Sequence, residues 1–136
     1  MPGADPAHWL YRLTPAEWLD AAETELGHAA EVLARRAARP GVTHARRAAG
    51  MAWNAVLAAA READTDVLVA RFGRSYMEHV AALASAPDVP DDVRAAAAVL
   101  RDTPPAPPEL ITLGKPDLHV LDAARAIVAH ARALVV

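Results

Sequence analysis

Arg74 and His79 are separated by four residues in the segment GRSYMEH, which spans residues 73–79. Cleavage of RNA without a metal needs a group that moves protons and a cation that stabilises charge on the phosphorus. Histidine can move protons because its pKa lies near neutrality, and the fork of an arginine matches two phosphate oxygens. This pair of residue types therefore makes Arg74 and His79 the candidate catalytic residues.

The helical geometry of the same segment sets a condition on this hypothesis. At about 100° per residue, positions five apart point about 140° apart around a helix. The two side chains would converge if Arg74 lies on the loop before the helix, where Gly73 permits an unusual backbone, or if a dimer shares the site. The alternative interpretation is structural: Arg74 forms a surface ion pair with Glu78, and His79 is a half-buried polar residue.

A second group of basic residues surrounds the first expected turn between helices. Its members are Arg35, Arg36, Arg39, His44, Arg46 and Arg47. They form either a solvated charged corner or a patch that contacts a phosphate backbone. The second interpretation, extended to the residues that share a helix face with His79, gives the candidate nucleic-acid or phosphate-binding residues His44, Arg46, Arg47, Ser75 and Tyr76.

The unit Glu25-Leu26-Gly27-His28 could be part of a metal site, because di-iron helical bundles use Glu-x-x-His on two of their helices. The chain has no second copy of this unit. Three histidines from different helices (His28, His79 and His130) could still meet. On this pattern the sequence predicts no metal and no cofactor, and a metal-binding bundle is kept as a third class of function.

The composition predicts an all-α protein. Alanine, the best helix former, supplies 35 of the 136 residues, whereas aromatic residues, which favour strands, make up 4%. A net charge of −3 argues against a protein that coats nucleic acid generally, and the lack of cysteine excludes disulfides and thiol chemistry. Neither a secretion signal nor an apolar run of membrane-spanning length is found. A cytoplasmic protein with no membrane association is expected.

One domain covering residues 1–136 is expected, with five helices. The first begins at a capping box formed by Thr14 and Glu17 and ends before the breaker Arg39-Pro40-Gly41. The second runs from Thr43 to Arg61 and is apolar on nearly all sides, which predicts that it is central and that Trp53 is buried.

The remaining three helices follow a predicted turn at residues 64–66. Residues 67–72 are either the end of that loop or an additional helical turn. The third helix spans residues 75–84, the fourth ends near Arg101, and the fifth is capped by Asp117. A stiff loop is expected at the PPAPP segment, residues 104–108.

This order of features resembles the HEPN superfamily of small prokaryotic helical-bundle domains. The likeness covers residues 15–135. EWLDAAETELGHAAEVL is similar to the opening helix of such domains and HARRAAGMAWNAVLAA to their central alanine-rich helix, while EHVAAL lies where many carry His-Asp-Leu and LGKPD resembles the stretch before their final helix. The resemblance implies an up-and-down bundle of four or five helices, frequently a homodimer, that is associated with RNA or nucleotides and often with a nucleotidyltransferase partner.

Catalytic members of that superfamily carry an arginine and a histidine four to six residues apart, as Arg74 and His79 are, although Ser75 stands where they usually have Asn, Asp or His. The sequence thus favours an RNA- or nucleotide-associated binding module of HEPN type, expected to be a homodimer in a prokaryotic defence or toxin–antitoxin system. The alternatives are a metal-independent ribonuclease that uses Arg74 and His79, and a metal-binding helical bundle.

Overall fold

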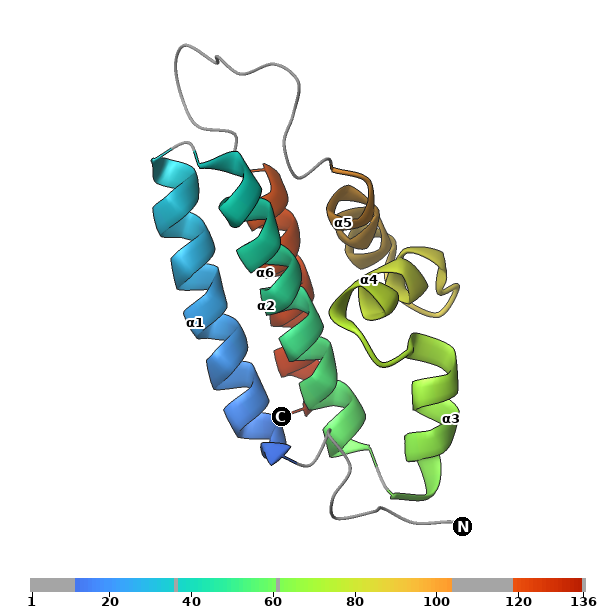
Figure 1. Cartoon of the computed structure of the whole chain (residues 1–136). Helices are drawn as coiled ribbons and strands as arrows, with labels where there is room; N and C mark the ends of the chain where they lie inside the picture. Colours follow the sequence, from blue (N-terminus) through green and yellow to red (C-terminus); the bar gives the residue numbers. More distant parts are fainter. Residues whose placement is uncertain (1–11, 36, 61, 104–118, 136) are drawn as a thin grey trace.

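Helices account for the secondary structure of the protein over the residues that the computed structural model describes, which are 12–35, 37–60, 62–103 and 119–135 (Figure 1). No strand occurs in these ranges. This confirms the all-α helical bundle, with six helices in the described residues where five were expected. They are α1 (Pro15–Ala34), α2 (Ala38–Ala59), α3 (Glu62–Phe72), α4 (Tyr76–Ser85), α5 (Asp91–Asp102) and α6 (His119–Val135).

Helix α1 begins where the sequence predicts. The hydroxyl of Thr14 accepts a hydrogen bond from the backbone N–H of Glu17 at 3.1 Å, and the Glu17 carboxylate accepts one from the N–H of Thr14 at 2.9 Å. The capping box is therefore confirmed. The apolar stripe of this helix is buried and consists of Trp18, Ala22, Leu26, Ala29 and Leu33.

The predicted breaker between the first two helices is wrong, because residues 39–41 lie inside the first turn of α2. Proline is tolerated there, since the first N–H groups of a helix have no acceptor within it. Gly41 allows α1 and α2 to approach closely, because a Cβ atom at this position would lie 2.3 Å from Leu33 Cδ2. The turn between the helices is consequently shorter than expected.

The predicted turn at residues 64–66 is also wrong, since these residues belong to α3. Asp and Thr are common in turns and also near helix N-termini, so their presence does not distinguish the two. The break comes later, at Gly73, which has a φ of 80°. Its N–H donates to the carbonyl of Val69 at 2.7 Å, a typical ending for a helix followed by a left-handed glycine.

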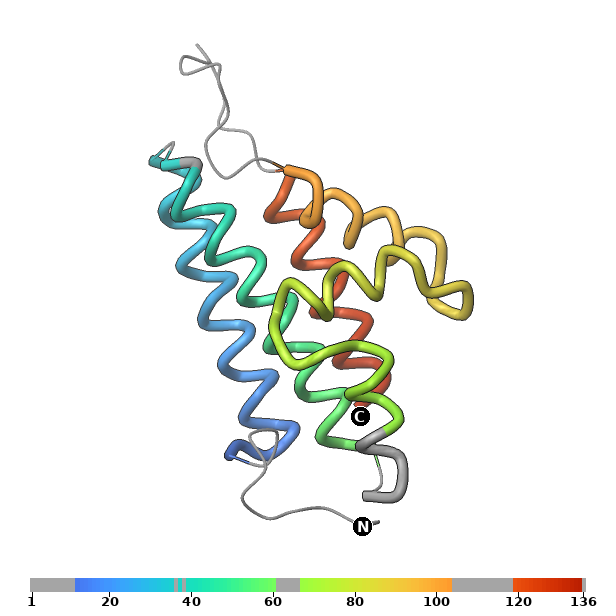
Figure 2. The backbone as a smooth tube through the Cα atoms, turned by 45° about the vertical axis from the view of Figure 1, so that its right-hand side comes forward, coloured from blue at the N-terminus to red at the C-terminus, as the bar shows by residue number. Residues whose placement is uncertain are grey.

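Helix α2 occupies the centre of the bundle and contacts each of the other five helices. Helices α1, α2 and α6 run side by side (Figure 1), and α4 and α5 cross them obliquely on one side (Figure 2). Trp53 in α2 is 3% exposed, which confirms its predicted burial. It packs edge-on against Phe72 and is stacked on His130, with ring centroids 5.3 and 6.1 Å away.

Several sequence predictions lie outside the described residues. They are the PPAPP loop, the LGKPD segment and the cap at Asp117. Among the helices that the structure does describe, none combines the length and the apolar character that a crossing of the bilayer requires.

Candidate metal centre

The register of the hairpin formed by α1 and α2 brings two pairs of polar residues together. In an antiparallel helix pair with a short turn, residues equally far from the turn lie at the same level. His28 and His44 are equally far in sequence from position 36, and so are Glu25 and Arg47. The four side chains therefore gather at two adjacent levels of the α1–α2 interface.

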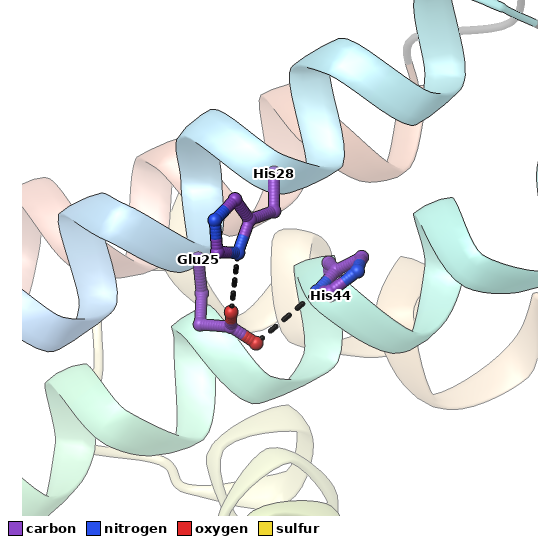
Figure 3. A group of neighbouring side chains, drawn as sticks. All are labelled: Glu25, His28 and His44. Atoms are coloured by element: carbon purple, nitrogen blue, oxygen red, sulfur yellow. Dashed lines mark hydrogen bonds and ion pairs between the residues drawn. The ribbon is translucent and has the colours of Figure 1, made fainter.

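The carboxylate of Glu25 is the centre of this group (Figure 3). Its Oε2 atom lies 2.9 Å from Nδ1 of His28, and its Oε1 atom lies 3.2 Å from Nδ1 of His44. The Nε atom of Arg47 lies 3.1 Å from the same Oε1. Glu25 is 7% exposed, so a buried carboxylate is shared by three basic side chains from two helices.

These partners keep Glu25 ionised. Burial disfavours a charged carboxylate and would raise its pKa. The hydrogen bonds from His28 and His44 and the positive charge of Arg47 act in the opposite direction and prevail, so the pKa of Glu25 lies below its ordinary value. A negatively charged oxygen is therefore available next to two imidazoles at neutral pH.

Glu25, His28 and His44 also satisfy the basic requirement for a metal site. One potential ligand atom from each lies within 4.8 Å of the other two. Ligand atoms around a tetrahedral zinc ion are about 3.3 Å apart, given bonds of about 2.0–2.1 Å. A movement of about 1.5 Å would thus close the three side chains around an ion. The side chain of His28 is 51% exposed, so rotation of its ring is unhindered on the solvent side.

Two of the sequence-predicted phosphate-binding residues, His44 and Arg47, are brought together in this cluster. Tyr76 lies near it. Burial raises the pKa of its phenol; the charge of Arg47 has a smaller lowering effect, and the charge of Glu25 a smaller raising one. Tyr76 packs against Gly50 of α2, where a Cβ atom would lie 2.3 Å from the tyrosine ring.

Arg46 and Ser75 have other structural roles. Arg46 turns to the C-terminus of α5, where its Nε donates to the carbonyl of Leu100 at 2.7 Å and a terminal nitrogen donates to that of Thr103 at 2.6 Å. It thereby satisfies carbonyl groups that a helix end leaves without partners. Ser75 caps α4 by accepting a hydrogen bond from the N–H of Glu78 at 3.1 Å.

The structure does not bring Arg74 and His79 into one open site. His79 is 0% exposed; its Nδ1 lies 2.8 Å from the carbonyl of Phe72 and its Nε2 lies 2.7 Å from the side-chain amide of Asn54. Burial lowers the pKa of this histidine. Arg74 is exposed, on the turn before α4. Proton transfer to RNA by His79 therefore stays a prediction, and it requires the ring to leave this enclosed position.

The three histidines whose meeting was considered from the sequence lie in different environments. His79 is in the core, His130 is stacked on Trp53, and His28 lies beside Glu25. The histidine that does meet His28 is His44, with ring centroids 5.3 Å apart. The equal spacing of both residues from the turn was the signal that could have identified this pair.

The comparisons with known proteins yield no relative for this chain: no protein-family model, no curated protein and no solved structure matches it. The resemblance to the HEPN superfamily therefore rests on sequence features alone. The candidate site rests on the geometry of its own side chains.

Proposed function

We propose that the protein binds one divalent transition-metal ion through Glu25, His28 and His44. The observation that carries this proposal is the convergence of three potential ligand atoms within 4.8 Å of one another. They come from two helices that pack directly together, and the carboxylate among them is buried and ionised. A metal would tie α1 to α2 at the level where these side chains already meet.

The ligand chemistry selects the class of ion. Two imidazoles and one carboxylate suit Zn²⁺ and its transition-metal neighbours, whereas Mg²⁺ and Ca²⁺ prefer sites made of oxygen atoms. Three protein ligands leave a fourth position of a tetrahedral ion for water or another molecule. Nδ1 of each histidine makes the hydrogen bond to Glu25, so coordination through Nδ1 would require the ring proton to lie on Nε2 instead.

Isothermal titration calorimetry with Zn²⁺, and separately with Mg²⁺, tests this proposal. We expect one Zn²⁺ per chain and no measurable heat with Mg²⁺. Glu25→Gln, His28→Gln and His44→Gln should each weaken Zn²⁺ binding by about tenfold or more, since even the loss of a residue that only supports a ligand has effects of this size. His119→Gln, a change at an exposed histidine of α6, is the control and should bind as the wild type does. Equal Zn²⁺ affinity in all five proteins would refute the site.

A second candidate function is the RNA- or nucleotide-associated module of HEPN type. Exposed arginines at the same end of the α1–α2 hairpin as the histidines favour it, namely Arg35, Arg39 and Arg47. In this form the protein would act in the cytoplasm as a homodimer, beside a nucleotidyltransferase partner in a defence or toxin–antitoxin system. The same module with RNA cleavage by Arg74 and His79 is the catalytic variant of this proposal.

Fluorescence anisotropy with a labelled single-stranded RNA tests the second candidate. Phosphate contacts make binding weaken steeply as salt rises, so affinity at low and at physiological salt should differ. Arg35→Gln combined with Arg39→Gln should weaken binding, and Arg125→Gln on α6 should not. RNA binding that is absent at low salt, or equally strong in both variants, would exclude the patch.

A further inference from the structure

Arg47 is the one group in the candidate metal centre whose charge opposes a metal ion. Its Nε donates to Oε1 of Glu25, the oxygen that His44 also contacts. Its side chain is 49% exposed, so the guanidinium lies at the boundary between the buried carboxylate and the solvent. Arg47 therefore occupies part of the space that a cation on Glu25 would take, and its charge would oppose that cation.

A metal on Glu25 changes the position of Arg47 in a predictable way. A divalent ion repels a guanidinium at contact distance, so the Arg47 side chain should release Oε1. Its backbone stays at the level of Glu25, because the register of α1 and α2 does not change. The freed guanidinium thus remains next to the ion. The ion and the guanidinium together then carry more positive charge than the single Glu25 carboxylate can neutralise.

Given the proposed metal ion, on which this inference rests, we propose that the loaded centre binds an oxyanion as its fourth ligand. One oxygen of the anion would occupy the open position on the ion, and the fork of Arg47 would hold a second oxygen. Carboxylates and phosphates both present two oxygens at the separation that an arginine fork matches. The ligand class is accordingly a carboxylate or a phosphate group.

Substitution of Arg47 should then have opposite effects on the two ligands. Arg47→Gln removes the cation that competes for Glu25, so the metal should bind more tightly. It also removes the fork, so the anion should bind the loaded protein less tightly. A residue that only stabilises the fold would not produce opposite changes, which makes the pair of measurements specific.

Cobalt(II) is a suitable probe, because the visible absorption of the ion reports both its binding and a change of its fourth ligand. The full chain is first titrated with Co²⁺, and the loaded protein is then titrated separately with acetate and with inorganic phosphate. In Arg47→Gln we expect Co²⁺ affinity to rise about tenfold and anion affinity to fall about tenfold, each a change of about 1.4 kcal/mol. The anion that binds the wild type more tightly identifies the group, carboxylate or phosphate.

Two further variants complete the design. Arg125→Gln removes an exposed arginine of α6, outside the cluster, and should leave both affinities unchanged. Arg47→Lys keeps the charge without the fork, so anion affinity should fall while Co²⁺ affinity stays at the wild-type value; this variant carries the test if Arg47→Gln does not fold, as judged by its thermal melting curve.

The outcomes separate this inference from the proposed metal site. No Co²⁺ binding by the wild type would overturn both. Co²⁺ binding with no spectral change on adding either anion would overturn the oxyanion ligand and leave the metal site standing. The same conclusion follows if anions bind the Arg47 variants as tightly as the wild type.

Discussion

The Nε2 atom of His79 and the side-chain amide of Asn54 lie 2.7 Å apart in the core, and this contact joins α4 to the middle of α2. The carbonyl of Phe72 can only accept, so Nδ1 of His79 donates to it. The Asn54 atom that faces Nε2 is Oδ1, at 2.7 Å. A ring kept neutral by burial must accept at Nε2, and this amide can donate there once its oxygen and nitrogen are exchanged, so that the N–H₂ group faces the ring. Two polar residues that are 0% and 1% exposed are thus satisfied by one another and by the backbone.

This contact predicts that His79 supports the fold. His79→Ala should lower the free energy of unfolding by about 2–4 kcal/mol, through a cavity and an orphaned amide. Arg74→Ala, at an exposed position, should change it by no more than about 0.5 kcal/mol. Urea denaturation of both variants measures the difference, and the same samples can be assayed for RNA cleavage. A His79→Ala variant that is as stable as the wild type but has lost a cleavage activity would support catalysis instead.

The burial of His79 also predicts a loss of stability in mild acid. Its pKa in the folded protein lies below the ordinary value of 6.5. Below that value the unfolded chain binds a proton that the folded protein does not. The contribution of His79 to stability is therefore fully present above pH 6.5 and is lost as the pH falls from 6.5 towards the folded pKa. Denaturation at about pH 7.5 and at about pH 5.5 should show a smaller loss for His79→Gln than for the wild type.

The effects of the other histidines on stability cancel in this comparison, because both proteins contain them. The pKa of Glu25 is depressed, so its contribution is lost only at lower pH, as the carboxylate is protonated below 4.5. Equal losses of stability for the wild type and His79→Gln over the higher pH range would contradict a neutral buried ring.

Arg46 is predicted to stabilise the end of α5. Arg46→Met should cost about 1.5–3 kcal/mol, because it removes charged hydrogen bonds to the carbonyls of Leu100 and Thr103. Arg35→Met is a matched control: its ion pair with Glu31 is exposed, at 3.6 Å, and should contribute less than about 0.5 kcal/mol. Thermal melting of both proteins distinguishes the roles, and equal effects would contradict the cap.

Two glycines in helices should respond in opposite ways to the same substitution. Gly50→Ala places a Cβ atom 2.3 Å from the ring of Tyr76, and the overpacking should destabilise the protein by about 1–3 kcal/mol. Gly27→Ala meets nothing within 4 Å and should stabilise α1 by about 0.5–1 kcal/mol. A stabilised Gly50→Ala protein, measured by its denaturation midpoint, would show that α2 and α4 are not in close contact.

The start of α1 makes a further prediction. Thr14→Ala removes the side chain that accepts from the N–H of Glu17 and should cost about 1 kcal/mol. Thr24 lies within the same helix, where its hydroxyl bonds to the carbonyl of Asp20 at 3.1 Å. Thr24→Ala should therefore be neutral or slightly stabilising, since alanine is the better helix former. Similar midpoints for the two variants would contradict the capping role.

Local sequence patterns predicted the parts of the fold that depend on neighbouring residues. The capping box of Thr14, the buried stripe of α1 and the central position of Trp53 were all predicted from spacing within a single helix. The same approach failed at residues 39–41 and 64–66. Proline, glycine, aspartate and threonine are compatible with a turn and with the first turns of a helix, and packing against Leu33 favoured the helix at Gly41.

The candidate metal centre depended on the tertiary structure. From the sequence, Glu25 and His28 formed half of a motif whose second copy was absent, and His44 and Arg47 belonged to a basic patch. The antiparallel packing of α1 against α2 placed all four side chains together. The packing of α4 against α2 buried His79 against Asn54, while Arg74 stayed in solvent on the turn before α4. Residue types and helical periods are properties of one segment, so the sequence alone predicted most of the helices, though not the start of α2 or α3. The partners of each polar side chain depend on how the segments pack, and only the folded chain decided them.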